Sequence, residues 1–383
     1  MAENPARLLE DPRVTIGQPI AELDTPTILV DLDRMERNIR DWQSWMDGHG
    51  VAFRVHAKTH KVPEIALQQV RAGARGICCA KVSEAEPFAA AGITDIALAY
   101  PILGEEKWRR VAALAAAGVR TTANVDSEEG ARQASDAADA AGVALYLQVD
   151  VDTGLHRGGI PEGEVDRVEA LARAIGRLPG VEFDGLTTHR SYGFAGRSGL
   201  AEEGHHEGEV VVGIAERLRS NGVEVREVTA GSSFTGKHVA EVPGVTESRA
   251  GTYVFFDLTH LYEGSCTEGD LALSALCRVN SLWGDGGLTI DGGTKTFSSD
   301  RALAAADGSL PPMAQAAGRP VFIERMTEEH GMGRAEGPVA LGERLRFYPS
   351  HACTCCNLTN EMVGYRDGRV ETLWQVAARG LRY

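Results

Sequence analysis

Short apolar runs alternate with amphipathic, helix-like stretches through the first two-thirds of the chain. The strand-like runs are Thr27–Asp31, Val51–Val55, Gly76–Ala80, Asp95–Ala99, Thr121–Val125, Ala144–Val151, Phe183–His189 and Glu227–Gly231. About eight strand–helix units over residues 24–260 predict an α/β fold, a TIM-like (β/α)8 barrel. A doubly wound sheet is the alternative, but no G-x-G-x-x-G follows the first strand.

The pattern changes after about Gly264. Short, often alternating runs follow, separated by glycine turns and by Asp-Gly turns such as Asp367-Gly368. This pattern predicts a β-rich C-terminal domain. We expect the domain to comprise residues 261–383 together with residues 1–23, and the barrel to comprise residues 24–260.

Composition narrows the class of protein. The chain has 383 residues, is 43% hydrophobic and carries a formal net charge of −15, which argues against a nucleic-acid partner. It contains no apolar run of about 20 residues that would span a membrane, and its first residues lack the apolar core of a signal peptide. Its 7 cysteines are scattered or adjacent and do not form a disulfide framework. We therefore expect a cytoplasmic protein with no membrane partner.

The segment Phe53–Lys61 places His56, Lys58, His60 and Lys61 around the end of a predicted strand. Neighbouring cations and burial both disfavour the ammonium form of a lysine, which frees its amine to attack a carbonyl. The aldehyde of pyridoxal 5′-phosphate (PLP) is such a carbonyl. The alternative interpretation is a solvated basic turn.

Other predicted strand ends also carry chemistry, and active sites on this fold lie at strand carboxyl ends. His189 is a candidate acid/base group, or a satisfied polar residue. Arg157 could tune a cofactor ring, or pair with a nearby aspartate. The segments Gly231-Ser232-Ser233 and Gly251-Thr252-Tyr253 suit phosphate, because glycine admits a close ligand and the N–H and hydroxyl groups donate to its oxygens.

A second site is predicted at His351-Ala352-Cys353. On an extended segment, residues i and i+2 share one face, so the ring and the thiol can reach one ion. Nitrogen with thiolate favours Zn²⁺ over Mg²⁺ or Ca²⁺, and two protein ligands leave room for water and substrate. The alternative is a four-ligand structural zinc that includes Cys355 or Cys356.

Together these residues resemble the fold-type III PLP enzymes of the D-threonine aldolase and eukaryotic-type D-serine dehydratase family. The likeness extends over nearly the whole chain, and that family has an alanine-racemase-like barrel followed by a β domain. Its most specific segments are His56–Lys61, Lys81–Ala85, Val149–Gly154, Gly251–Phe255, Glu329–Gly331 and Pro349–His351.

The resemblance implies that Lys58 binds PLP covalently, and that His351 and Cys353 hold a divalent metal that contacts the substrate β-hydroxyl. Zn²⁺ is the favoured metal, with Mn²⁺ as an alternative. We predict Lys58 and His189 as catalytic residues. The predicted cofactor-binding residues are Lys58, His56, Arg157, Tyr192, Gly231, Ser232, Ser233, Gly251, Tyr253 and Asp291. A small β-hydroxy-D-amino acid substrate and a homodimer are also implied.

Several reactions fit these residues. Aldolases of the family typically carry Asp two residues after the metal histidine, where this chain has Cys353, whereas Gly76–Cys79 is aldolase-like. We therefore expect a dehydratase of D-serine or another D-3-hydroxy-amino acid, which yields a 2-oxo acid and ammonia. Retro-aldol cleavage to glycine and an aldehyde is the second expectation. An amino-acid racemase and a non-catalytic PLP carrier are further alternatives.

Overall fold

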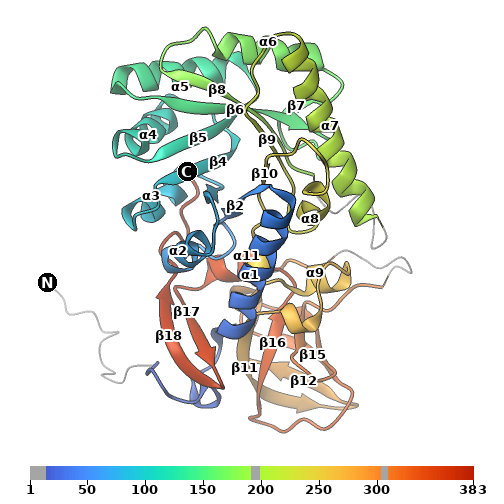
Figure 1. Ribbon diagram of the computed structural model, residues 1–383. Coiled ribbons are helices and arrows are strands. Elements are labelled where there is room, and N and C mark those ends of the chain that lie inside the picture. Colours follow the sequence, from blue (N-terminus) through green and yellow to red (C-terminus); the bar gives the residue numbers. More distant parts are fainter. Residues whose placement is uncertain (1–13, 191–198, 303–308) are drawn as a thin grey trace, which may run out of the picture. The chain divides into compact units, whose positions relative to one another are not determined.

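The computed structural model describes residues 14–190, 199–302 and 309–383 (Figure 1). The chain divides into two compact units. The barrel unit comprises Arg37–Val254, Tyr262–Ser265 and Ala377–Tyr383, and the β unit comprises residues up to Glu36, Phe255–Leu261 and Cys266–Val376. Within the described ranges, none of the helices is both long enough and apolar enough to cross a membrane.

The barrel unit contains a closed parallel sheet. In the described part of the chain, eight strands follow the order β5-β4-β3-β2-β10-β9-β8-β6, and β5 pairs back to β6. These strands are β2 (Ala52–His56), β3 (Gly76–Cys79), β4 (Asp95–Pro101), β5 (Arg120–Val125), β6 (Leu145–Asp152), β8 (Val181–Thr188), β9 (Glu227–Ala230) and β10 (Glu247–Ser248). A short strand, β7 (Ile160–Pro161), extends the sheet beside β6. The predicted (β/α)8 barrel is thus confirmed.

Helices lie around the outside of this sheet (Figure 1). The strands are packed on both faces, which explains their continuous apolar runs, and β3 is buried at every position. The helices bury one stripe each and end at local signals. Ser127 Oγ accepts the Gly130 N–H at the start of α5, and Gly142 ends that helix with a φ of 65°. The helices are α1 (Leu32–His49), α2 (Pro63–Arg71), α3 (Val82–Ala90), α4 (Glu105–Ala116), α5 (Glu128–Ala141), α6 (Val165–Ile175), α7 (Leu200–Ser220) and α8 (Gly236–Val239).

The β unit is built on a second sheet, with the order β12-β15-β14-β13-β16-β11-β1-β17-β18 in the described residues. Because β11 also pairs with β12, the strands from β11 to β16 close on themselves. The strands are β1 (Thr27–Asp31), β11 (Leu273–Trp283), β12 (Gly287–Ile290), β13 (Ala314–Ala316), β14 (Val321–Met326), β15 (Gly331–Ala335), β16 (Arg344–Pro349), β17 (Glu361–Arg366) and β18 (Arg369–Gln375). Short helices α9 (Leu258–Tyr262), α10 (Thr294–Phe297) and α11 (Ala352–Leu358) connect them.

Two strands of the predicted barrel need correction. Thr27–Asp31, predicted as the first barrel strand, pairs antiparallel with β11 and parallel with β17 in the β unit. The strand that completes the barrel is instead β10, which has only 2 residues. The division into units also differs from the predicted boundaries at residues 24 and 260, because residues 24–36 and 255–260 belong with the β unit.

Candidate active site

A cavity of about 440 Å³ lies at the carboxyl ends of the barrel strands. It is lined by residues that end or follow seven of the eight strands, the exception being β9. The charged and imidazole side chains among them are His56, Lys58, Lys81, Asp126, Asp150, Asp152, Arg157, His189 and Arg249. The structure therefore brings together four of the predicted site residues: His56, Lys58, Arg157 and His189.

The segment after β2 contains two lysines, Lys58 and Lys61, whose surroundings differ. Lys61 lies 3.5 Å from the buried carboxylate of Glu84, so its charge is paired. His60 is fully buried and bonded to Gln69, which gives it a structural place. Lys58 instead lines the cavity, and its N–H donates to His56 Nδ1 at 3.4 Å. The basic turn thus divides into a structural half and a half that faces the cavity.

The two cavity histidines are held neutral. Burial lowers the pKa of His56 well below its ordinary value, and the charges of Lys58 and Arg249 lower it further. Burial and the charge of Lys58 lower the pKa of His189 in the same way. At neutral pH both rings can therefore accept or pass a proton without first losing one.

A buried carboxylate balances the cavity cations. Burial raises the pKa of Asp150 to about 6, although Arg249 and the Asn124 amide, 3.2 Å away, favour its ionised form. Arg249 is itself buried and donates to the Thr188 carbonyl at 3.0 Å. Burial lowers the pKa of Arg157, and Asp150 opposes that shift. Cations clustered in a partly closed cavity suit an anionic ligand. No role for Asp150 or Arg249 was predicted from the sequence.

A second carboxylate of β6 shapes the loop that carries Arg157. Asp152 Oδ1 accepts the N–H groups of Gly154 at 3.0 Å and His156 at 2.9 Å. Asp126, at the end of β5, accepts the Gly159 N–H at 3.2 Å. These bonds fix the loop from both sides and so position Arg157 at the cavity.

The two glycine-containing segments predicted to hold phosphate meet each other. Ser233 Oγ accepts the N–H groups of Gly251 and Tyr253, each at 3.1 Å. A Cβ added to Gly251 would lie 2.8 Å from the His56 carbonyl oxygen, so glycine is required for this approach. Gly231 has a φ of 95°, in the left-handed region. Ser233 Oγ accepts both N–H groups and can still donate its own hydroxyl proton, and the glycines leave room for a close ligand, so these residues fit the phosphate end of PLP.

Glu207 of α7 supports this phosphate loop and was missed by the sequence analysis. Its buried carboxylate accepts the Gly231 N–H at 3.0 Å and the Thr235 hydroxyl at 2.7 Å. Ser232 Oγ in turn accepts the Phe234 N–H at 3.1 Å. A buried acid in the middle of a helix gives no local signal in the sequence, because its partners are 24 and 28 residues away.

Two predicted cofactor residues, Tyr253 and Asp291, have side chains that are bonded within their own units. The Tyr253 hydroxyl accepts from Gln69 at 2.8 Å, and its ring packs on Trp42, so only its backbone faces the phosphate loop. Asp291 belongs to the β unit, where it accepts the Thr25 hydroxyl and the Arg278 N–H. Tyr192 lies outside the described residues.

The predicted metal pair lies at the start of α11. Only His351 is extended, with φ and ψ of −139° and 113°, whereas Cys353 is in the first helical turn, so the predicted extended geometry is wrong. Burial lowers the pKa of His351, but the charge of Cys353 and hydrogen bonds with Asp300 and Cys353 outweigh it and raise the pKa to about 11. Imidazole and thiol therefore do lie against each other.

Carboxylates hold this turn in place. His351 Nδ1 donates to Asp300 Oδ2 at 2.8 Å, which leaves Nε2 for a metal. Thr354 Oγ1 donates to the same Asp300 oxygen at 2.9 Å. Asp257 Oδ2 accepts the Ala352 N–H at 2.9 Å. Neither aspartate gives a local signal in the sequence, because they lie 51 and 95 residues from their partners.

The neighbouring cysteines do not complete a four-ligand site. Cys355 is buried and donates to the Thr296 carbonyl at 3.1 Å, and burial raises its pKa to about 12. Burial raises the pKa of Cys356 as well. Among the described residues, no set of three His, Cys, Asp or Glu ligand atoms within 4.8 Å includes His351 or Cys353. The donors fit a divalent ion with open coordination positions rather than a closed structural zinc.

Two models of known protein families match the chain, one in its barrel part and one in its β-rich part. Residues 30–259 match the model of the alanine racemase N-terminal domain, and residues 272–365 match one described as "Putative serine dehydratase domain". The chain is 36% identical to D-threonine aldolase from Arthrobacter sp., over 95% of each protein. It belongs to the D-threonine aldolase and D-serine dehydratase family of PLP enzymes. As a member of this family the chain is a PLP-dependent lyase of the aldolase or dehydratase type.

Two further relatives of this family are similar over nearly their whole length. D-threo-3-hydroxyaspartate dehydratase from Delftia sp. strain HT23 is 35% identical, over 92% of this chain and 97% of the relative. A solved structure of D-threonine aldolase from Filomicrobium marinum superposes with a TM-score of 0.88 at 29% identity, covering 97% and 99% of the two chains. A cysteine-to-alanine variant of the dehydratase, 32% identical with a TM-score of 0.82 and covering 94% and 98%, was solved in a metal-free form.

Proposed function

We propose that this lyase dehydrates β-hydroxy-D-amino acids, giving a 2-oxo acid and ammonia, with the help of PLP and a divalent metal. The observation that carries the proposal is the imidazole–thiol pair of His351 and Cys353. An aspartate would be expected in place of Cys353 if the chain followed the aldolase pattern of its family. The metal-free form of the dehydratase variant that lacks one cysteine supports a cysteine ligand in the dehydratase relatives.

The barrel cavity supplies the residues that would hold PLP. Lys58 would bind its aldehyde, and the segments containing Gly231, Ser233 and Gly251 would take its phosphate, with the Ser233 hydroxyl as a donor. Arg157, which lines the cavity, would meet the ring. When bound, PLP supplies an electron sink that weakens the bonds to the substrate Cα.

Proton transfer falls to the side chains around Lys58. In the proposed reaction its amine takes the proton from the substrate Cα, because a lysine that holds the cofactor already lies at the reacting atom. His189 is held neutral by burial and by the charge of Lys58, so it can relay that proton. Arg249, buried beside Asp150, favours binding of the anionic substrate.

His351 and Cys353 would hold the divalent ion, with Zn²⁺ preferred and Mn²⁺ as the alternative. Once bound, the metal supplies Lewis acidity at the substrate β-hydroxyl, which makes that group a better leaving group. Asp300 keeps His351 in the orientation that presents Nε2. Asp257 fixes the backbone at Ala352, between the two ligands.

Aldol cleavage is the second candidate, favoured by the 36% identity to D-threonine aldolase. The same residues would serve it, with the metal assisting loss of the hydroxyl proton rather than of the hydroxyl. The bond broken would then be Cα–Cβ, and the products glycine and an aldehyde. A racemase is a more distant candidate, since it needs no metal.

One assay separates these reactions. The metal-loaded holoenzyme is incubated with D-serine, D-threonine and D-threo-3-hydroxyaspartate, and 2-oxo acid, ammonia, glycine and aldehyde are measured. We expect 2-oxo acid and ammonia in equal amounts. Glycine and an aldehyde without release of ammonia would establish the aldolase instead. Full activity after exhaustive chelation, with the L-amino acid as product, would establish a racemase.

Cofactor attachment is tested separately by absorbance. We expect a band near about 410–420 nm that borohydride removes, leaving a reduced adduct on residue 58 in a peptide map. An adduct on a different lysine would overturn the role of Lys58. We also propose a homodimer, following the family resemblance, and light scattering on the purified protein measures its mass.

A further inference from the structure

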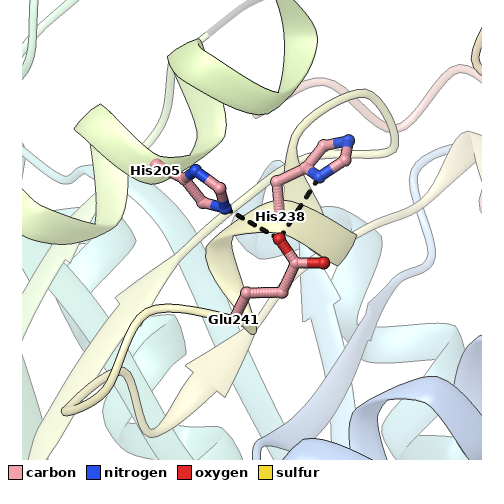
Figure 2. A group of neighbouring side chains, drawn as sticks. All are labelled: His205, His238 and Glu241. Carbon is pink, nitrogen blue, oxygen red and sulfur yellow. Dashed lines mark hydrogen bonds and ion pairs between the residues drawn. The ribbon is translucent and has the colours of Figure 1, made fainter.

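Three ligand side chains converge in the barrel unit, and none of them was assigned a role above. His205 lies in α7, His238 in α8, and Glu241 just beyond α8. Their ligand atoms all lie within 4.8 Å of one another. Both rings point at the same oxygen, since Glu241 Oε2 is 2.7 Å from His205 Nε2 and 3.5 Å from His238 Nδ1 (Figure 2).

Close packing of the α7 backbone against residues 235–242 holds these side chains together. A Cβ added to Gly204, next to His205, would lie 2.7 Å from the His238 Cβ and 2.9 Å from the Thr235 carbonyl oxygen. A Cβ added to Gly208, one turn later, would lie 2.8 Å from a methyl carbon of Val242. Two glycines at i and i+4 thus let α7 press against residues 235–242. His205 and His238 are therefore positioned next to each other by close backbone packing.

The geometry and chemistry suit zinc. Two imidazole nitrogens and a carboxylate oxygen are the ligand set of known zinc sites. At a tetrahedral zinc with bonds of about 2.0–2.1 Å, neighbouring ligand atoms lie about 3.3 Å apart. The distances of 2.7 and 3.5 Å to Glu241 lie on either side of that value, so a bound ion needs only small side-chain shifts. The three side chains are 44%, 34% and 35% exposed, which leaves room for a water ligand.

The ionised state of Glu241 also suits a zinc ligand. A hydrogen bond from His205 lowers the pKa of Glu241, and His238 lowers it further against a small effect of burial. The carboxylate is therefore ionised at neutral pH. An ion pair needs only one histidine, whereas here two rings approach a single oxygen, which a shared cation explains.

We propose that His205, His238 and Glu241 form a Zn²⁺ site that ties α7 to α8. The site is separate from the proposed His351–Cys353 pair and does not depend on the reaction. Its place in the fold gives it a consequence. Glu207, half a turn further along α7, accepts hydrogen bonds from Gly231 and Thr235, and Thr235 leads directly into α8. A zinc ion that joins α7 to α8 should therefore stabilise the phosphate loop from outside the cavity.

The test removes the other proposed metal site first. Full-length protein with both His351→Ala and Cys353→Ala is stripped by chelation and titrated with ZnCl₂ by calorimetry. We expect about one zinc ion per chain. Adding His205→Ala or Glu241→Gln should weaken this binding at least tenfold. His206→Ala is the matched control, because His206 is a neighbouring exposed histidine on α7 and lies 4.0 Å from Glu162. It should leave binding unchanged.

Two results would overturn the site: no zinc bound by the doubly substituted protein, or equal binding by the His205→Ala and His206→Ala variants. Thermal unfolding supplies the second measurement. Zinc should raise the melting temperature of the His206→Ala variant but not of Glu241→Gln, while all variants melt together in the presence of chelator. Zinc binding with no rise in melting temperature would overturn the tie between the helices.

Discussion

The pKa of histidine is shifted in opposite directions in the barrel cavity and at the start of α11. In the cavity, burial and neighbouring cations lower the pKa of His56 and His189 well below its ordinary value. At α11, burial also opposes the charged form of His351, but Cys353 and Asp300 outweigh it and raise the pKa to about 11. The cavity therefore favours the neutral imidazole, and the turn at α11 favours the protonated imidazolium.

This difference shows what each region can do. Neutral rings beside Lys58 are suited to moving protons, and the cations around them suit an anionic cofactor and substrate. A ring set between a thiol and a carboxylate sits where a positive ion is stabilised, whether that ion is a proton or a metal. The two regions therefore divide the proposed reaction between proton transfer and metal binding.

Replacing Lys58 should have the largest effect, because the cavity's chemistry depends on its amine. Lys58→Ala should lower kcat/KM by at least about a thousandfold and abolish the visible absorbance band. Lys58→Arg retains the positive charge that holds His56 and His189 neutral, but it should be equally inactive. Turnover by the Lys58→Arg variant above a tenth of the native rate would show that charge, and not covalent binding, is what the cavity needs. Steady-state assays and absorbance scans measure both effects.

The second prediction concerns the thiol at α11. Cys353→Ala should lower metal content and reduce kcat about a hundredfold, because one of two protein ligands is lost. Cys355→Ser is the matched control: Cys355 donates to Thr296 and a serine hydroxyl can do the same. Elemental analysis and product assays on both variants measure the effect. Equal losses in the two variants would mean that the turn was disrupted, not a ligand removed.

Cys353→Asp sharpens the comparison between reactions. A carboxylate at this position should retain the metal while giving the pair the ligand expected of the family's aldolases. We expect the ratio of glycine to 2-oxo acid to rise. An unchanged ratio with full metal content would show that the identity of this ligand does not select the reaction.

A smaller effect is expected at Asp300, which touches His351 rather than the metal. Asp300→Asn removes the negative charge but keeps an oxygen that can accept from His351 Nδ1. Metal affinity should fall about tenfold, since partners of metal ligands typically contribute a factor of about 10–100. Competition with a chromogenic chelator measures the affinity. Unchanged metal affinity would refute this positioning role.

The sequence predicted the barrel but gave it one wrong strand and missed another, and the reason is physical. Thr27–Asp31 and Ala52–His56 have the same burial pattern, with three buried residues between two half-buried ends. Residue periodicity cannot tell which sheet such a strand joins. The strand Glu247–Ser248 escaped notice because both of its residues are polar, although both are buried.

The candidate site could be predicted from the sequence where its signal is local. Lys58 and His56 were chosen because titratable residues cluster at a strand end, and the structure places both at one cavity. His351 and Cys353 were chosen because their spacing is that of metal ligands. Asp150 and Asp300 were missed, because their roles arise from burial and from partners distant in the sequence. Asp291 stays a prediction as a cofactor residue, and within the β unit it accepts hydrogen bonds from Thr25 and Arg278.

The last prediction concerns stability rather than activity, and two carboxylates of β6 whose effects on it respond to pH with opposite signs. Burial raises the pKa of Asp150 from 3.8 to about 6. Between about pH 4 and 6 the folded protein keeps a proton that the unfolded chain releases, so this residue's contribution to stability falls as pH rises. Burial also acts to raise the pKa of Asp152, but hydrogen bonds from His156 and Gly154 lower it overall. Its contribution is present above the unfolded pKa and is lost as pH falls.

Asparagine substitutions separate the two. Relative to native protein, Asp150→Asn without PLP should gain about 2 kcal/mol in free energy of unfolding between pH 4 and 7, since a carboxylate that is costly to ionise has been removed. Asp152→Asn should instead become less stable than native protein as pH rises, because it lacks the ionised acceptor for His156 and Gly154. Urea denaturation at several pH values measures both differences. If the free energy of unfolding of the two variants changes in the same direction with pH, then burial does not set the pKa of Asp150. The cavity would then be more open to water than the neutral state of His56 and His189 requires.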